Sequence, residues 1–166
     1  MLNINLEVAI KTALEAGKAI MKVHDSVIEV ECKDDKSPLT QADKDANDVI
    51  NRHLKLTNIP IISEENKQTD YSKRRKWNKC WIVDPVDGTK EFIKRNGEFS
   101  VNIALVENYV PILGMVYLPV TKEGFFGVTG DVEGLPKGAI KWTEEGYQVI
   151  EARAPESTLV AMTSRS

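Results

Sequence analysis

A short apolar run that stops at a proline corner constrains the fold of this chain more than any other part of its sequence. Residues 80–83 (Cys-Trp-Ile-Val) are all apolar, and residues 84–89 (Asp-Pro-Val-Asp-Gly-Thr) follow directly. An uninterrupted apolar run bounded by turn residues is typical of a strand buried inside a sheet. Pro85 fixes its own φ angle and biases Asp84 toward extended geometry. The segment therefore predicts a central strand that stops at Asp84 in a rigid corner.

The residues after this corner are suited to binding ions. The backbone carbonyl of Val86 is free to face a cation, and Gly88 permits a tight turn. Thr89 stands at the start of a short helix that continues through residues 90–93. Free backbone N–H groups at a helix start, together with the helix dipole, favour an anion there. The corner therefore predicts an anion site beside a cation site.

A second acidic pair follows another short apolar strand. Residues 59–62 (Ile-Pro-Ile-Ile) predict this strand, and Ser63, Glu64 and Glu65 end it. If the two strands are neighbours in one sheet, three or four carboxylates meet at their ends. Clustered carboxylates repel one another and need cations, and oxygen ligands without histidine or cysteine select Mg²⁺, Mn²⁺ or Ca²⁺.

A plainer interpretation competes with this metal site. An Asp-Pro-X-Asp-Gly segment is often only a solvent-exposed turn with an Asx cap. The apolar strand in front, Thr89 behind and the second acidic pair favour the metal site. Glu65 is expected to point away from the site or to support it. Cations beside an anion-binding turn suit phosphate-ester chemistry, because metal ions neutralise phosphate and activate water.

Hydrophobic periodicity predicts two helices before this region. Apolar residues recur at three- and four-residue spacing over residues 3–23, which indicates an amphipathic helix. A second helix begins near Thr40 to Asp43, where a hydroxyl and an acid three residues apart resemble a helix-start pattern. Residues 27–33 alternate like a short strand, residues 33–38 form a polar loop, and the charged stretch 66–79 is expected to be a surface loop.

Strands dominate the remainder of the chain. Residues 99–106, 110–118 and 124–128 predict an antiparallel meander, and residues 139–142 and 147–151 predict a further hairpin. Residues 160–163 start another apolar segment. Helices followed by a run of antiparallel strands indicate the α+β class, with helices packed on a largely antiparallel sheet.

Composition excludes several classes of protein. The 166 residues suit a single domain, and the net charge of −3 argues against a surface for nucleic-acid polymers. No apolar run approaches the ~20 residues of a membrane-spanning helix, and no secretory signal is visible. Cys32 and Cys80 are distant from each other and from His24 and His53, which excludes a zinc cluster. We therefore expect free thiols and a cytoplasmic location; the sequence does not predict the oligomeric state.

At this point a family resemblance becomes specific. Residues 81–93 resemble the signature of the lithium-sensitive, magnesium-dependent phosphatases that include inositol monophosphatase. Residues 33–43 (Lys-Asp-Asp-Lys-Ser-Pro-Leu-Thr-Gln-Ala-Asp), 62–65 (Ile-Ser-Glu-Glu) and 111–119 (Pro-Ile-Leu-Gly-Met-Val-Tyr-Leu-Pro) agree in the same order. The resemblance implies that residues 1–158 form the N-terminal metal-binding subdomain of an αβαβα sandwich. Residues 159–166 would begin a C-terminal subdomain.

The resemblance also implies a set of metal ligands. Glu64 would bind a metal ion and help to hold the attacking water, and Asp84 would bridge two Mg²⁺ ions. The Val86 carbonyl and the Asp87 carboxylate would complete separate metal sites, with two or three ions in all.

Further roles concern the water and the phosphate. Thr89 would orient or help to deprotonate the nucleophilic water, with Glu64 as its partner. Asp43 matches a family carboxylate near the third metal ion or its water network, although a plain helix cap fits it equally well. Asp87, Gly88 and Thr89 would bind the scissile phosphate, the last two through backbone N–H groups. The implied reaction is in-line attack by metal-activated water without a covalent phospho-enzyme, and it would be inhibited by Li⁺.

Residues 90–99 resemble one branch of this family, the 3'(2'),5'-bisphosphate nucleotidases of the CysQ type. That branch implies a small nucleotide bisphosphate, 3'-phosphoadenosine 5'-phosphate of sulfate assimilation, as substrate. Lys90, Lys94 and Arg95 would contact a nucleotide phosphate or be solvated charges around a helix. An inositol-phosphate phosphatase of the same fold and a truncated, non-catalytic module that binds metal or phosphate are the alternatives.

The chain departs from the family pattern in one respect. Family members carry a further aspartate ligand in a Trp-Asp-x-x-Ala motif, but none of Trp77, Trp81 and Trp142 is followed by aspartate. The stop inside an apolar segment favours a piece of a longer enzyme over a natural truncation. We therefore expect the 166-residue chain alone to bind Mg²⁺ weakly and to turn over little substrate.

Overall fold

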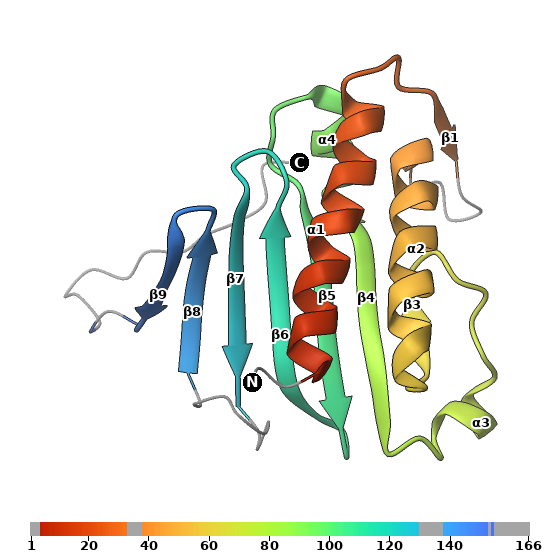
Figure 1. The fold of residues 1–166 in the computed structure, drawn as a ribbon. Coiled ribbons are helices and arrows are strands. Elements are labelled where there is room, and N and C mark those ends of the chain that lie inside the picture. Colours follow the sequence, from red (N-terminus) through yellow and green to blue (C-terminus); the bar gives the residue numbers. More distant parts are fainter. Residues whose placement is uncertain (1–3, 33–37, 130–137, 153, 155–166) are drawn as a thin grey trace.

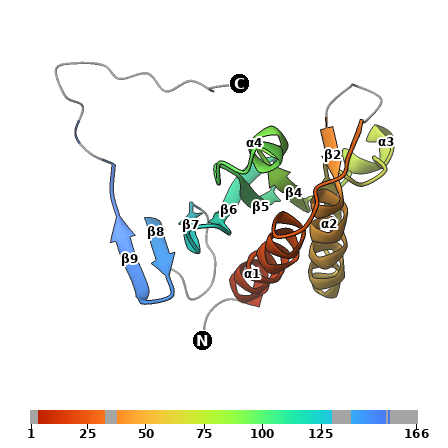
Figure 2. The ribbon, with the colours of Figure 1, turned by 90° about the horizontal axis from the view of Figure 1, so that it is seen from above.

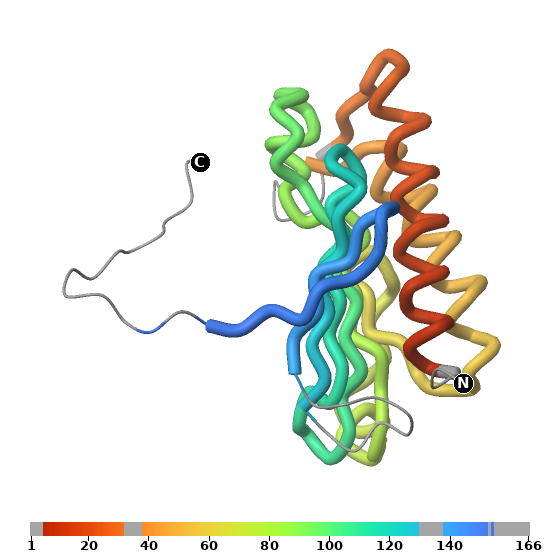
Figure 3. The backbone as a smooth tube through the Cα atoms, turned by 60° about the vertical axis from the view of Figure 1, so that its left-hand side comes forward, coloured from red at the N-terminus to blue at the C-terminus, as the bar shows by residue number. Residues whose placement is uncertain are grey.

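The computed structural model describes residues 4–32, 38–129, 138–152 and 154, and these form two helices on one face of a seven-stranded sheet. Figures 1 and 2 show α1 (Ile4–His24) and α2 (Gln41–Leu54) side by side on the same face. Figure 3 shows the same arrangement from the side. The predicted α+β class, with helices on a largely antiparallel sheet, is confirmed.

Both helices bury an apolar stripe that is rich in alanine. The small side chains let α1 and α2 pack against each other and against the central strands of the sheet. The fully buried residues of the two stripes are Leu6, Ala9, Ala13, Ala16, Ile20, Ala42, Ala46, Ile50 and Leu54. The helix predicted over residues 3–23 is thus confirmed within one residue at each end. The second helix begins at Gln41, within the predicted starting region of Thr40 to Asp43.

The sheet has the strand order β3-β4-β5-β6-β7-β8-β9. Its strands are β3 (Ile61–Ser63), β4 (Lys79–Asp87), β5 (Ser100–Glu107), β6 (Val110–Leu118), β7 (Glu123–Val128), β8 (Gly138–Thr143) and β9 (Gly146–Ile150). β3 and β4 are parallel. Every later neighbouring pair is antiparallel, which confirms the predicted meander and the hairpin after it.

β4 continues beyond the point at which the sequence predicts its end. Asp84 pairs with Asn102, and the ladder resumes with Asp87 opposite Ser100. One extra residue on β4 therefore lies between these two pairs, as in a β-bulge. The prediction that the strand stops at Asp84 is wrong, because the Pro85 corner distorts the ladder without ending it.

The short strand predicted over residues 27–33 is confirmed in part by β1 (Val30–Cys32), which pairs with β2 (Pro38–Thr40). β2 and a single 3₁₀ turn after α2, η1 (Lys55–Thr57), were not predicted from the sequence. The predicted surface loop contains the one-turn helix α3 (Tyr71–Arg74), capped by Asp70, whose Oδ1 accepts the Ser72 N–H at 2.8 Å. Elements of three or four residues are too short to show a hydrophobic period. Residues 33–37 of the predicted loop and the segment 160–163 lie outside the described residues.

A cluster of aromatic rings packs α4 (Thr89–Lys94) against the C-terminal end of α1. The rings of Phe92 and Phe99 meet edge to face with centroids 5.2 Å apart, and the His24 ring lies 5.7 Å from each. Phe92 is fully buried. His24, to which the sequence assigns no chemical role, is therefore a packing residue at the base of α4.

Two further observations concern Cys80 and the helices. The Cys80 thiol is free, as predicted, and partial burial raises its pKa. No helix within the described ranges has the length and apolar character needed to cross a membrane.

Candidate metal and phosphate site

The parallel pairing of β3 with β4 brings the two acidic segments together. Ser63 pairs with Val83, and the first residue after β3, Glu64, donates its N–H to the Val83 carbonyl at 3.2 Å. Glu64 and Asp84 therefore lie next to each other toward the carboxyl end of the β3–β4 pair. This confirms the condition on which the predicted carboxylate cluster depended, and it places the cluster at the upper end of β4 in Figure 1.

The surroundings of Asp84 disfavour the ionised form of its carboxyl group. Burial raises the pKa of its carboxyl group to about 7, and the charges of Glu64, Asp87 and Asp43 contribute in the same direction. The N–H of Val86, which donates to Asp84 Oδ1 at 3.2 Å, opposes this increase. Three carboxylates thus disfavour the ionised form of the Asp84 carboxyl group, and a nearby cation would relieve this repulsion.

Two oxygen atoms of the Pro85 corner, one from Val86 and one from Asp87, accept hydrogen bonds from neighbouring side chains. The side chain of Val86 is buried, and its carbonyl accepts the Thr89 hydroxyl at 3.1 Å. Asp87 is exposed, and its Oδ2 accepts Asn102 Nδ2 at 2.9 Å. Asn102 of β5 was not predicted from the sequence, since it pairs with Asp84 in the ladder and only the folded structure brings its side chain to Asp87.

Asp43 joins the site from the first turn of α2. Its Oδ2 accepts both the backbone N–H of Thr40 at 2.7 Å and the Thr40 hydroxyl at 2.6 Å. Its Oδ1 accepts the Thr89 hydroxyl at 3.2 Å. The helix-cap interpretation of Asp43 is therefore confirmed, and its other carboxylate oxygen contacts Thr89. Its role near a metal ion or its water network stays a prediction.

The structure adds a contact of Thr89 that was not expected from the sequence. Its hydroxyl donates to Asp43 Oδ1, while the partnership of Thr89 with Glu64 in activating water stays a prediction. Asp43 and Thr89 are 46 residues apart and lie on different helices. No local pattern links them, so the pairing becomes visible only when α2 and α4 are placed on the sheet.

Gly88 forms the N-cap of α4 with a φ of 93°. The helix has six residues, and its first hydrogen bond runs from the Phe92 N–H to the Gly88 carbonyl at 2.9 Å. The roles of Asp87, Gly88 and Thr89 in holding a phosphate stay predictions. Two basic side chains near this turn have other partners. Lys94 forms an ion pair with Glu91 at 3.3 Å, and Arg95 donates to the Ser26 carbonyl.

We predict that Gly88→Ala lowers the free energy of unfolding by about 1–3 kcal/mol. The added Cβ would lie 2.9 Å from the backbone carbonyl oxygen of Glu98, and alanine disfavours a φ of 93°. Urea unfolding measures the change. Gly114→Ala is the matched control, because no atom lies within 4 Å of its added Cβ. Equal unfolding midpoints for the two variants would contradict the prediction.

The donor set fits a hard divalent cation in its chemistry. Carboxylate oxygens and a backbone carbonyl are the ligands that Mg²⁺ accepts. In the described parts of the chain, no group of three or more acidic, histidine or cysteine side chains is arranged so that it could hold a metal ion. The ligand roles of Glu64, Asp84, Val86 and Asp87 therefore stay predictions, and the mutual repulsion at Asp84 is the observation that favours them.

Comparisons with known proteins agree with this fold. Residues 3–166 match the inositol monophosphatase family. The 3'(2'),5'-bisphosphate nucleotidase CysQ of Salmonella typhimurium is 45% identical over 159 residues, which cover 90% of this chain and 61% of that protein. The CysQ of Escherichia coli K12 is 43% identical over the same coverage of both chains, 90% and 61%.

Solved structures give the same result. The crystal structure of CysQ from Bacteroides thetaiotaomicron, a bacterial member of the inositol monophosphatase family, has a TM-score of 0.80 and 40% identity. The match covers 98% of this chain and 63% of that one. An IMPase of Thermotoga maritima has a TM-score of 0.69 and 29% identity, over 82% of this chain and 50% of that one.

Fold and site together define an α+β protein with a cluster of carboxylates at the end of a parallel strand pair. The chain belongs to the inositol monophosphatase family. The resemblance identified from residues 81–93 is thereby confirmed. The chain spans about three fifths of the length of the CysQ relatives, 61% of the Salmonella typhimurium protein.

Proposed function

We propose that this protein is a magnesium-dependent phosphatase that hydrolyses 3'-phosphoadenosine 5'-phosphate to AMP and phosphate. The observation that carries the proposal is the convergence of Glu64, Asp84 and Asp87 beside the Thr89–Asp43 hydrogen bond. The names of the CysQ relatives support the substrate. The proposal places residues 1–158 in one metal-binding subdomain; residues 159–166 lie outside the described part of the chain.

Four residues would hold two or three Mg²⁺ ions. The carboxylates of Glu64, Asp84 and Asp87 supply the negative charge, and the Val86 carbonyl adds a neutral oxygen ligand. Bound Mg²⁺ would neutralise the phosphate and lower the pKa of a coordinated water. Asn102 holds Asp87 through its 2.9 Å hydrogen bond and so limits the directions in which that carboxylate can point.

The Thr89–Asp43 pair would orient the attacking water. The single proton of the Thr89 hydroxyl is shared between Asp43 Oδ1 and the Val86 carbonyl. Because that proton is engaged, the lone pairs of the hydroxyl oxygen remain available to accept a hydrogen bond from water. The two hydrogen bonds from Thr40 to Asp43 Oδ2 fix the carboxylate in this orientation.

Two other functions compete with this proposal. The IMPase of Thermotoga maritima shares the fold, which supports an inositol-phosphate phosphatase as the second candidate. The third is a module that binds metal or phosphate without catalysis. The sequence after Thr89 favours the nucleotide, since residues 90–99 resemble the nucleotidase branch.

A substrate panel distinguishes the three candidates. Phosphate release from 3'-phosphoadenosine 5'-phosphate and from inositol 1-phosphate is measured at stoichiometric protein, with Mg²⁺ and with a chelator. We expect Mg²⁺-dependent release from the nucleotide at a rate at least about tenfold higher than from inositol phosphate, because residues 90–99 resemble the nucleotidase branch and that ratio is an ordinary degree of enzyme specificity. The opposite order would establish the inositol-phosphate phosphatase. Binding of Mg²⁺ and nucleotide without any release would establish the non-catalytic module.

A further inference from the structure

A cluster of neutral polar side chains joins α2 to the turn that follows β3. Its members, here called the amide cluster, are Asn47, Asn51, Ser63 and Asn66. Asn47 is 8% exposed and Ser63 is fully buried. The proposed function uses none of these four residues, although Ser63 directly precedes Glu64 and Asn66 follows it by two residues.

The turn held by the cluster is the one that carries Glu64. The Asn66 N–H donates to the Ser63 carbonyl at 3.2 Å, which closes a β-turn with Glu64 and Glu65 as its central residues. The Glu65 N–H also donates to Ser63 Oγ at 3.3 Å. The direction of the Glu64 side chain therefore depends on how firmly both ends of this turn are held.

Asn47 contacts both ends of the turn at once. Ser63 Oγ donates to Asn47 Oδ1 at 2.7 Å, and Asn47 Nδ2 donates to Asn66 Oδ1 at 2.9 Å. One primary amide provides both the acceptor and the donor that this bridge requires. Asn51 strengthens the Asn66 end through two reciprocal hydrogen bonds, each of 3.0 Å.

The same helix also holds the other half of the site. Asn47 follows Asp43 by four residues, so both side chains lie on one face of α2, one turn apart. Asp43 contacts Thr89, and Asn47 holds the Glu64 turn. Because a helix is rigid over one turn, α2 fixes the distance between the carboxylate of the water-orienting pair and the turn of the metal ligand.

We propose that Asn47 is a positioning residue that presents Glu64 to the metal ion by bridging Ser63 and Asn66. The inference rests on the proposed function, in which Glu64 binds Mg²⁺. Without the bridge, the turn must be ordered when the ion binds, and the affinity for the ion falls. The hydroxyl and amide groups around Asn47 are neutral, so the bridge adds no further negative charge beside the cluster at Asp84.

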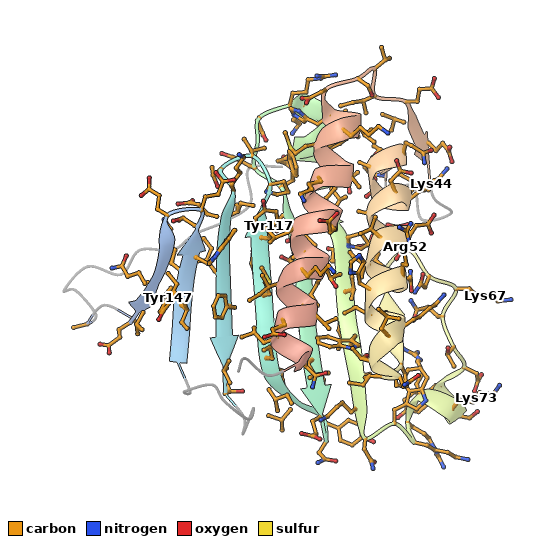
Figure 4. All side chains as sticks on the ribbon, in the orientation of Figure 1. Lys44, Arg52, Lys67, Lys73, Tyr117 and Tyr147 are labelled. Atoms are coloured by element: carbon orange, nitrogen blue, oxygen red, sulfur yellow. The ribbon has the colours of Figure 1, made fainter. Side chains whose placement is uncertain are left out.

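The test compares Asn47→Ala with two controls in the same helix. Ile50→Val removes one buried methylene and lowers stability without touching the turn. Arg52→Ala alters the exposed face of α2, where Figure 4 labels Arg52. Asn66→Ala removes the far end of the bridge and serves if Asn47→Ala does not fold. Mg²⁺ affinity is measured by calorimetry on the metal-free chain, and backbone amide exchange is followed by nuclear magnetic resonance.

We expect Asn47→Ala to lower Mg²⁺ affinity about ten- to hundredfold and to speed exchange at Glu65 and Asn66. Ile50→Val and Arg52→Ala should keep the wild-type affinity. Equal affinity of Asn47→Ala and wild type would overturn the positioning role, as would an equal loss in Ile50→Val. Absence of Mg²⁺ binding by the wild-type chain itself would overturn the proposed function and the positioning role with it. Failure of the positioning role and failure of the proposed function are distinguishable, because only failure of the proposed function appears as a loss of Mg²⁺ binding in the wild-type chain.

Discussion

Replacing Asp84 by asparagine should lower Mg²⁺ affinity by at least about a hundredfold and abolish metal-dependent phosphate release. Asp84 lies where the charges of Glu64, Asp87 and Asp43 meet, and its carboxylate is the proposed bridge between two ions. Asparagine keeps the size of the side chain but removes the negative charge. Calorimetric titration with Mg²⁺ and a phosphate-release assay measure the two effects.

The same substitution should stabilise the metal-free protein near neutral pH. The pKa of Asp84 is raised to about 7 from its ordinary value of 3.8, so between these values the folded chain binds more protons than the unfolded chain. The stability that this carboxyl group contributes is fully present below its unfolded pKa and is lost as pH rises through about 7. In chelator, the melting temperature of wild type should therefore fall between about pH 5.5 and about pH 7.5, and Asp84→Asn should reduce that fall.

A matched control separates this effect from a change in net charge. Asp48→Asn makes the same change at an exposed position of α2 and should alter neither Mg²⁺ affinity nor the pH dependence of melting. Protons also compete with Mg²⁺ for Asp84, so wild-type affinity for the ion should weaken as pH falls below about 7. Unchanged Mg²⁺ affinity in Asp84→Asn would remove this residue from the metal site.

The second large effect is expected at Thr89. Thr89→Val replaces the hydroxyl by a methyl group of nearly the same shape, and it should lower the rate of phosphate release about 10²- to 10⁴-fold. The hydroxyl contacts Asp43 at 3.2 Å and is the proposed acceptor for the attacking water. Mg²⁺ affinity should change far less, because the ligand carboxylates remain. Single-turnover release and calorimetry together measure this separation.

Thr89→Ser is the informative control for that prediction. Serine keeps the hydroxyl and its hydrogen bond to Asp43, so it should retain most of the rate, whereas a purely structural role for the methyl group would make serine the more damaging change. The valine variant also leaves Asp43 Oδ1 without this donor, which should cost about 1 kcal/mol of stability. Equal rates for Thr89→Val and wild type would exclude the hydroxyl from the reaction.

Local patterns predicted most of the fold correctly, because the relevant signals repeat along the chain. The periodic stripe over residues 3–23 predicts α1, and alternation from residue 99 onward predicts β5, β6 and β7. The error at Asp84 has a local cause of a different kind. Pro85 signals an interruption, but whether a strand ends there or resumes after a bulge depends on the partner strand β5.

The candidate site also contains features that the sequence predicts and features that only the tertiary structure reveals. Sequence alone located the two acidic pairs, the Pro85 corner and the helix start at Thr89, since each is a contiguous motif with its own conformational preference. It did not reveal Asn102 or Asn47, because an isolated asparagine carries no signal of the residue that it will face. The charge repulsion at Asp84 likewise depends on residues from three separate segments.

The apolar run and corner around Asp84 thus determined by themselves that a strand leads into an oxygen-rich turn, because backbone restriction and residue polarity act locally. Only the tertiary structure decided what that turn meets. The parallel pairing of β3 with β4 placed Glu64 beside it, and the packing of α2 on the sheet made Asp43 the partner of Thr89. These contacts join residues 20 or more positions apart, and they are chosen by the burial of whole helix and sheet faces rather than by any short pattern.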